Sequence, residues 1–286
     1  MALEHERVVR AGVVGFATRG GAITSLSAHR CELAAVPDAI ASFTCLERLD
    51  VSGNRLPGAP AWLGALGRLR ELYLYDNEMT ALPDRIGELS RLRVLDLNRN
   101  RLPRLPESLG DLARMVFLYA AENRLAGLPA SLGRLESLRY LNLAGNQLAE
   151  LPTAVGELTA LDELRLYGNQ LTALPDEIGR LAGLRELHAR DNELTSLPPS
   201  LGRLSGLELL DLRNNALAEL PDELGALDGL LYLDLRSNRL ASPASIPAGV
   251  GELPALRKLD LRWNPLSSLP AWVDRLERRG CRVLYS

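Results

Sequence analysis

The sequence predicts an α/β solenoid, a stack of similar repeats that share one parallel sheet. Two observations carry this prediction: an asparagine recurs every 23 residues, and the same spacing of leucines surrounds each one. Repetition at a fixed period of this length is the signature of repeat architectures, in which each repeat packs only on its neighbours. The asparagines at this position are Asn54, Asn77, Asn100, Asn123, Asn146, Asn169, Asn192, Asn215, Asn238 and Asn264.

Eleven repeats are expected over residues 23–269. Cys31 lies 23 residues before the first asparagine and takes its position in the first repeat, where we expect a buried thiol. The last asparagine follows after 26 residues, because three extra residues fall within 242–250. We expect residues 1–22 and 270–286 to cap the two ends of a single structural domain, since terminal repeats must shield their leucine faces.

One repeat shows why each element should form. Leu164 and Leu166 alternate with polar residues, which indicates a strand with both leucines on one face. Arg165 and Tyr167 then lie on the opposite, outward face. The chain turns at Asn169, and a row of such asparagines can bond the backbones of successive turns.

The second half of the same repeat predicts a short helix or 3₁₀ turn. Pro175 and Asp176 suit a first helical turn, because proline lacks an N–H that would be unsatisfied there and an acid favours the helix dipole. Gly179 is a typical helix terminator. The leucine face of one repeat can be buried only by stacking on the next repeat.

The resulting motif, LxxLxLxxNxLxxLPxxIGxL, resembles that of leucine-rich repeat proteins over residues 23–276. The 23-residue period with Leu-Pro is similar to the intracellular Ras-associated subclass and its plant and bacterial relatives. The resemblance implies a curved horseshoe with an inner parallel sheet of about eleven strands and short convex helices or 3₁₀ turns. It also implies a protein-binding role, with a small Ras-like GTPase as one partner class.

Composition favours a cytoplasmic protein that binds neither nucleic acid nor membranes. The net charge is −3, so the chain lacks the basic field that attracts nucleic acid. The sequence has no long apolar run that would span a membrane and no signal-peptide pattern at its start. Three unclustered cysteines indicate reduced thiols. We expect a monomer that contributes to signal transduction by binding.

Lysine is nearly absent: Lys258 is the only one among the 33 basic residues. One interpretation is the codon bias of a GC-rich genome. The alternative is a bacterial effector delivered into a host cell, where few lysines leave few ubiquitination sites, and which acts by occupying a host protein. Composition alone does not separate the two interpretations.

Aromatic side chains gather on the outward, concave strand positions of the N-terminal half. Six of the seven tyrosines fall on outward strand positions, and adjacent strands lie about 4.8 Å apart. The sequence therefore predicts a continuous apolar patch that binds a partner, because aromatics on a rigid sheet are typical hot spots. The alternative is that tyrosine simply suits strands. The predicted patch consists of Tyr73, Tyr75, Val94, Phe117, Tyr119 and Tyr140.

The C-terminal half of the same face is charged, because Asp-Leu-Arg recurs on three successive strands. An acidic column beside an arginine column would orient a partner and speed encounter. The alternative is that the pairs neutralise each other and keep the sheet hydrated. The predicted polar part of the partner site consists of Arg165, Tyr167, His188, Arg190, Asp211, Arg213, Tyr232, Asp234, Arg236, Asp260 and Arg262.

Chemistry-bearing motifs are scarce. The sequence contains no phosphate loop, GxGxxG, CxxC or HExxH pattern, so no catalytic, cofactor or metal site is predicted. His188 and Asp211 should be neighbours on adjacent strands, which leaves an enzyme using this pair as a second alternative. No serine or cysteine occupies an adjacent outward position to complete a triad.

Overall fold

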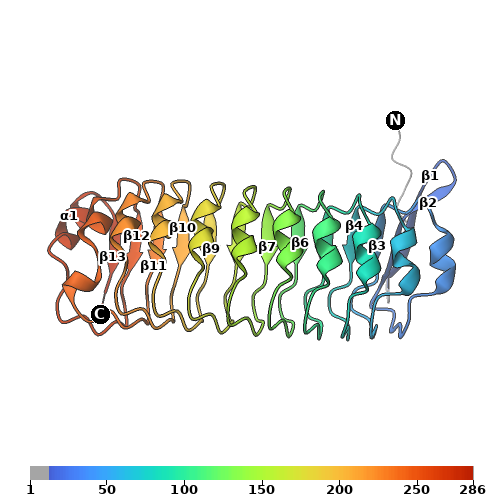
Figure 1. Ribbon diagram of the computed structural model, residues 1–286, viewed down its shortest axis with the longest axis horizontal. Helices are drawn as coiled ribbons and strands as arrows, with labels where there is room; N and C mark the ends of the chain where they lie inside the picture. Colours follow the sequence, from blue (N-terminus) through green and yellow to red (C-terminus); the bar gives the residue numbers. More distant parts are fainter. Residues whose placement is uncertain (1–12, 286) are drawn as a thin grey trace. The chain divides into compact units, whose positions relative to one another are not determined.

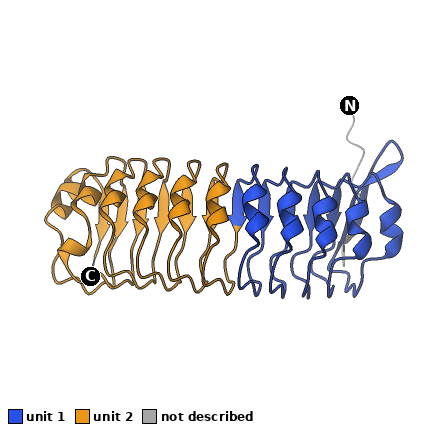
Figure 2. Ribbon diagram, in the orientation of Figure 1, with its two compact units in different colours: residues 1–141 blue, residues 142–286 orange. Residues whose placement is uncertain are grey.

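The computed structural model describes residues 13–285, and the chain divides into two compact units, residues 1–141 and 142–286 (Figure 2). Both units repeat one pattern: a three-residue strand, a turn at the asparagine and a short 3₁₀ helix. Within each unit the strands form one layer and the short helices another (Figure 1). Residues 1–12 of the predicted N-terminal cap lie outside the described residues.

The first unit has its strands in sequence order, with β1 antiparallel to β2 and the following strands parallel. The last strand to begin in it, β7 (Tyr140–Asn142), ends in the second unit. The other elements are β1 (Val13–Arg19), β2 (Ala22–His29), η1 (Asp38–Ser42), β3 (Arg48–Asp50), η2 (Ala61–Ala65), β4 (Glu71–Tyr73), η3 (Asp84–Glu88), β5 (Val94–Asp96), η4 (Glu107–Asp111), β6 (Phe117–Tyr119) and η5 (Ala130–Arg134).

The second unit follows the same order, with parallel pairing from β8 to β13. It differs by an extra short helix between β11 and β12 and by an α-helix between β12 and β13. Its elements are η6 (Thr153–Glu157), β8 (Glu163–Arg165), η7 (Asp176–Arg180), β9 (Glu186–His188), η8 (Pro199–Arg203), β10 (Leu209–Asp211), η9 (Asp222–Ala226), β11 (Tyr232–Asp234), η10 (Pro243–Ser245), η11 (Ala248–Glu252), β12 (Lys258–Asp260), α1 (Val273–Arg278) and β13 (Arg282–Leu284).

The core is the leucine face that the repeat pattern predicts. Leu95, Leu97 and Leu102 of one repeat are fully buried, as are Leu118 and Leu164 at equivalent strand positions. Since each leucine packs between neighbouring repeats, burial depends on stacking within a unit. The predicted solenoid class is confirmed, with eleven strands at the repeat positions, β2 to β12, and β1 and β13 at the ends.

The asparagine row bonds successive turns, as predicted. The Asn100 Nδ2 donates to the carbonyls of Leu74 and Leu97, both at 3.0 Å, and its Oδ1 accepts the Met79 N–H at 3.0 Å. The Leu74 carbonyl and the Met79 N–H belong to the preceding repeat. Each buried amide therefore satisfies backbone groups that neither the strand nor the 3₁₀ helix can reach.

The short helices are 3₁₀, and most of them begin directly after a proline and end directly before a leucine. Pro106, for example, precedes η4, and the Leu112 N–H that ends it bonds to Leu109 O. The glycine in each turn has a further role. A Cβ added at Gly110 would collide with the Ser131 carbonyl of the next 3₁₀ helix, so glycine permits neighbouring turns to stack closely.

The ends and one ladder position differ from the simple repeat. Cys31 is only half-buried, so the expectation of a buried thiol is wrong; its N–H bonds to Asn54 Oδ1 at 2.9 Å. The three extra residues near 242–250 form η10, which Ser242 and Ser245 cap through each other's backbone. Trp272 lies against the last 3₁₀ helix and is buried. The capping role of residues 270–286 stays a prediction.

Candidate functional site

The outward face of the first unit carries a compact group of rings, which we call the aromatic cluster: Phe117, Tyr119 and Tyr140. The ring centroids of Tyr119 and Tyr140 are 4.9 Å apart, and those of Phe117 lie 6.4 Å from each of the other two. Phe117 is 38% exposed, while both tyrosines are half-buried. The strand alternation that buries Leu118 therefore turns large apolar surface towards solvent at this point.

Tyr73 and Tyr75 stand apart from this cluster. The Arg48 guanidinium lies 4.6 Å from the centre of the Tyr73 ring, and the Tyr73 hydroxyl donates to Glu71 Oε2 at 3.1 Å. Burial, and then the nearby Glu71 carboxylate, raises the pKa of Tyr73. The ring of Tyr75 contacts His29, at 5.9 Å between centroids.

A carboxylate divides the predicted patch. In the strand register, Val94 lies beside Phe117, but Asp96 lies between Tyr73 and Tyr119. The expectation of one continuous apolar patch is therefore wrong, although all six predicted residues do lie on the outward face. The sequence signal was available, because the alternation that points Val94 outward also points Asp96 outward.

Asp96 is half-buried and forms no ion pair among the described residues. Its Oδ1 accepts the Asn98 backbone N–H at 3.0 Å. Burial raises the pKa of Asp96 to about 6, opposed by that hydrogen bond and reinforced by the charge of Asp50. At neutral pH the Asp96 carboxylate is therefore charged, and the half-buried charge lowers the stability of the folded state.

We predict that Asp96→Asn stabilises the protein at pH 8 by about 1–2 kcal/mol, after allowance for solvent screening of a partly exposed group. The folded-state pKa lies above the unfolded value of 3.8, so the cost of the charge is complete above about pH 6 and absent below about pH 4. Urea unfolding at both pH values measures the difference. A gain that is equal at pH 4 and pH 8 would contradict the titration of Asp96 as its cause.

The outward face of the second unit is polar, and its charges are paired within each strand. Arg236 donates to Asp234 at 2.7 Å, and Arg213 lies 3.6 Å from Asp211. Burial raises the pKa of Asp211, while Arg213 opposes the shift. The pairing fits the alternative that these charges neutralise each other. Apart from Asp260, the other predicted residues on this face are also half-buried or exposed. Arg165 pairs with Glu163, and Arg190 lies over the Tyr167 ring.

Asp260 does not fit the prediction of an exposed binding residue, because it is completely buried. Arg262 donates to it at 2.7 Å, and the Arg236 Nε and Lys258 Nζ lie at 3.4 and 3.9 Å. Leu284 of β13 lies beside it in register. Burial favours the neutral acid, but the hydrogen bonds from Arg262 hold the pKa of Asp260 below its usual value. Asp260 therefore supports the arginines and cannot itself touch a partner.

His188 and Asp211 are neighbours in register, as predicted. The imidazole, however, contacts Glu186 at 3.0 Å and Glu163 at 3.7 Å. Together Glu163, Glu186 and His188 offer three ligand atoms within 4.8 Å of one another, a set that can hold a divalent cation. No sequence motif predicts this set, because Glu163 lies on β8 and the other two residues lie on β9, one repeat further along the chain. Arg165 Nε already occupies the Glu163 carboxylate, at 2.5 Å.

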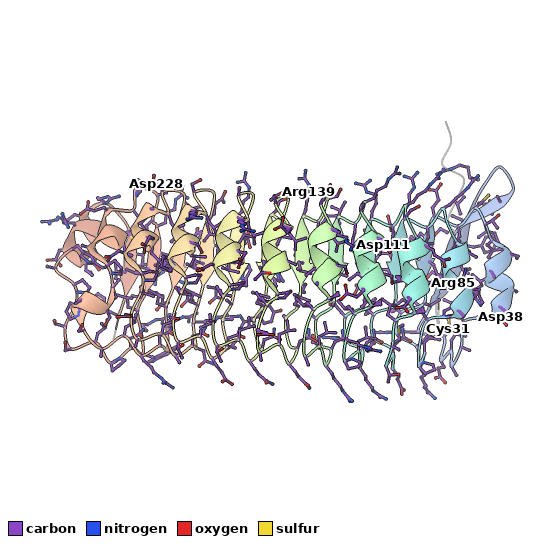
Figure 3. The ribbon with its side chains drawn as sticks, viewed as in Figure 1. Cys31, Asp38, Arg85, Asp111, Arg139 and Asp228 are labelled. Atoms are coloured by element: carbon purple, nitrogen blue, oxygen red, sulfur yellow. The ribbon has the colours of Figure 1, made fainter. Side chains whose placement is uncertain are left out.

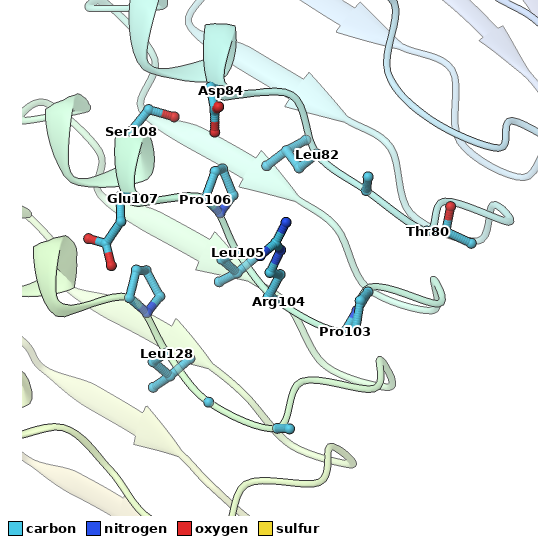
Figure 4. Close-up of a pocket in the computed structure, with 14 residues that line it drawn as sticks. Thr80, Leu82, Asp84, Pro103, Arg104, Leu105, Pro106, Glu107, Ser108 and Leu128 are labelled. Carbon is cyan, nitrogen blue, oxygen red and sulfur yellow. The ribbon is translucent and has the colours of Figure 1, made fainter.

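Hollows lie on both units of the described chain. A hollow of about 180 Å³ on the outward face of the second unit is lined by Leu209, Tyr232 and Lys258 together with three polar neighbours. A wider groove crosses the first unit between the turns and the 3₁₀ helices (Figure 4). Leu82 and Leu105 in that groove are repeat leucines that are already buried, so the groove follows the furrow between repeats, and Asp84, Arg104 and Glu107 add charged groups to its lining.

The layer of 3₁₀ helices carries paired charges. Figure 3 shows Arg85 and Asp111 on this layer. Arg85 bonds to Glu88 at 2.9 Å, and Asp111 lies 3.6 Å from Arg134. These exposed pairs are typical of a hydrated surface. Within residues 13–285, no helix has the length and apolar character needed to cross a bilayer.

Comparison with known proteins places this repeat in a known class. A family profile described as "Leucine-rich repeat region" matches residues 22–139 and 176–278, and a second, "Leucine rich repeat", matches residues 136–194. No protein of curated function matches the sequence.

Among solved structures, the chain is similar to the Arabidopsis receptor kinase HAESA in complex with the peptide hormone IDA and the co-receptor SERK1. The identity is 26%, the TM-score 0.77, and the match covers 95% of this chain and 47% of that chain. The plant peptide hormone receptor RGFR1, in complex with RGF2, is 26% identical at a TM-score of 0.58, over 88% of this chain and 49% of that one.

The functional domain of InlJ from Listeria monocytogenes shares the fold at a TM-score of 0.76, with 23% identity over 92% of this chain and 53% of that chain. The chain thus spans about half the length of these three proteins.

Proposed function

This chain belongs to the leucine-rich repeat family, and we propose that it is a non-enzymatic module that binds a partner protein. The proposed binding surface is the outward face of the first unit, centred on the aromatic cluster. The second unit contributes polar contacts that orient the partner. We also propose a monomer, with a small Ras-like GTPase as the first partner class to examine.

The observation that carries this proposal is the contact between the rings of Phe117, Tyr119 and Tyr140 on the outward face of the first unit. Rigid strands hold these side chains, so little conformational entropy is lost when a partner covers them. Buried aromatic anchors supply much of the energy of protein interfaces. An exposed ring such as Phe117 has no packing reason to be there, because the leucine face already fills the core.

Two similar proteins support a binding role. HAESA is described in complex with the peptide hormone IDA, and the plant peptide hormone receptor RGFR1 in complex with RGF2. Since fold does not fix function, these complexes support protein or peptide binding as the class of function and say nothing of the partner's identity.

The polar residues of the second unit fit an orienting role better than an anchoring one. Arg213 and Arg236 already pair with their own aspartates, so a partner gains little net energy by replacing these contacts. Complementary charge still guides encounter and fixes register. Asp260 is excluded from direct contact by its burial.

We propose the cytoplasm as the working compartment, because Cys31, Cys45 and Cys281 are all free thiols. Burial raises the pKa of Cys281, which makes that thiol unreactive. The low lysine content keeps the host-cell effector as an alternative, and both alternatives act through the same binding surface.

The test is affinity capture from a lysate of the source cell, followed by mass spectrometry. We expect a partner that binds the wild-type chain and is lost from the variant Tyr73→Ala, Phe117→Ala, Tyr119→Ala, Tyr140→Ala. These side chains lie outside the leucine core, so circular dichroism should show a folded variant. Recovery of a small GTPase would favour the Ras-associated type.

A matched control carries Glu88→Ala and Asp111→Ala, two exposed residues in the layer of 3₁₀ helices. This control should capture the partner as the wild-type chain does. Equal capture by all three proteins would remove the outward face of the first unit as the binding surface.

A further inference from the structure

The repeat that carries Asp96 lacks an arginine that three other repeats possess. On β10, β11 and β12 the outward aspartate is followed two residues later by an arginine that pairs with it. On β5 the equivalent sequence is Asp96-Leu97-Asn98. The paired counterparts are Asp211 with Arg213, Asp234 with Arg236, and Asp260 with Arg262.

Asn98 does not replace the missing charge. Its side-chain Oδ1 accepts the Ala121 backbone N–H at 2.7 Å, and its own backbone N–H donates to Asp96. One hydrogen bond therefore ties the asparagine side chain to the neighbouring repeat, and the other ties its backbone to Asp96. Among residues 13–285 no lysine, arginine or histidine lies within ion-pair distance of the Asp96 carboxylate.

The same sheet shows what normally completes such a position. Arg48 lies over the Tyr73 ring at 4.6 Å and bonds to Glu71 at 2.9 Å. In the second unit, Arg190 lies over the Tyr167 ring at 4.4 Å and 3.7 Å from an aspartate. A cation between a carboxylate and a tyrosine face is thus a repeated arrangement on the outward face, and each contact of this kind is favourable.

At Asp96 the carboxylate and the flanking rings are present, and no cation of residues 13–285 pairs with the carboxylate. Tyr119 flanks Asp96 on β6, and Val94 and Phe117 form an apolar strip beside it in register. Tyr73 flanks it on β4, with one ring face already covered by Arg48. The Asp96 carboxylate therefore lies next to the aromatic cluster on the β6 side.

We infer that Asp96 receives a lysine or arginine side chain of the partner protein. The cation lies on the Asp96 carboxylate beside the Tyr119 ring, and its aliphatic stem lies along Val94 and Phe117. This inference rests on the proposed function, because it names the chemistry that the outward face recognises. A neutral or acidic side chain at this point would leave the half-buried carboxylate unpaired or repelled, so the site selects for positive charge.

Binding of the cation should depend on pH. The groups that face Asp96 are Tyr73 and Glu71 on β4 and Tyr119 on β6, with Asp50 and Arg48 one strand further on β3; Glu71 is paired with Arg48. Since burial raises the pKa of Asp96 to about 6, the carboxylate gains a proton, and the site loses its charge, as pH falls through that value. Affinity for a cation should decline in the same range.

The experiment is an NMR titration of the full chain with N-acetyl-lysine methylamide, set against N-acetyl-norleucine methylamide, its neutral counterpart. We expect the lysine probe to bind in the millimolar range, to lower the apparent pKa of the Asp96 carboxyl and to shift the Tyr119 ring resonances. The norleucine probe should leave that pKa unchanged. Equal effects of the two probes, or no effect of either, would overturn the inference.

Three variants sharpen the result. Asp96→Asn should abolish the response to lysine, while Asp50→Asn, at the equivalent position of β3 and bonded to Ser52, should retain it. Asn98→Arg rebuilds Asp-Leu-Arg and should block the site with its own guanidinium. A lysine response that persists in both Asp96→Asn and Asn98→Arg would place the probe elsewhere and contradict the inference.

Binding of the captured partner to two variants distinguishes a failure of this inference from a failure of the proposed function. Asp96→Asn should weaken partner binding about 10-fold or more, as expected for a charge-assisted contact. If Asp96→Asn binds the partner fully while the four-alanine variant does not, the binding surface stands and the cation site is wrong. If the four-alanine variant binds fully, the proposed surface is wrong, and the lysine titration alone decides whether Asp96 binds cations.

Discussion

Replacing Asn169 with alanine is expected to lower the free energy of unfolding by about 3 kcal/mol. Its amide donates to the carbonyls of Leu143 and Leu166, at 3.0 and 2.8 Å, and accepts the Leu148 N–H at 3.1 Å. Alanine leaves these three buried backbone groups without partners, and each such group costs roughly 1–3 kcal/mol, less whatever water recovers. Urea unfolding followed by circular dichroism measures the change.

Gln170→Ala is the matched control, because the next side chain along the chain is an exposed amide. It should change the unfolding free energy by less than about 0.5 kcal/mol. If Asn169→Ala proves as mild as this control, the asparagine row contributes little to stability and its regularity needs another explanation.

Gly110→Ala is expected to destabilise the first unit by about 2–3 kcal/mol, or more if the stacked turns must separate. The added methyl would overlap the Ser131 carbonyl oxygen and lie 2.6 Å from the Ser131 Cβ. Both atoms belong to η5, which stacks directly on η4, so relief requires the backbones of two repeats to move apart. Thermal unfolding measures the loss as a lower Tm.

Gly127→Ala provides the comparison within the same unit, since an added Cβ there meets no atom within 4 Å. This change should be neutral or slightly stabilising, because alanine restricts the unfolded chain. Equal losses from the two substitutions would show that backbone conformation, and not the close approach of 3₁₀ helices, requires glycine in the turn.

The repeat pattern predicted the fold because each strand and turn is determined by residues within one period. The alternation of Leu164 and Leu166 and the position of Asn169 follow from local geometry alone. The role of Gly110 could not be predicted from the sequence. A glycine that ends a helix and a glycine that lets two backbones approach closely look the same there. Only the stacking of η4 on η5 separates them.

The candidate site was predicted less completely, because it depends on contacts between repeats. Asp260 shares its motif with Asp211, yet Asp260 alone is fully buried, since the arginines of two strands and the neighbouring β13 cover it. The sequence of one repeat does not single out Asp96, for a related reason. Its importance lies in the missing arginine at Asn98 and in the rings on flanking strands, and a single repeat shows neither.

The most direct test of the account is the affinity of the captured partner for two single variants, measured by calorimetry. Phe117→Ala removes the exposed ring of the aromatic cluster, and Arg134→Ala removes an exposed side chain of the 3₁₀ layer in the same unit. We predict a loss of about 2 kcal/mol or more, roughly 30-fold in Kd, for Phe117→Ala and almost none for Arg134→Ala. The reverse order of effects would contradict binding on the outward face.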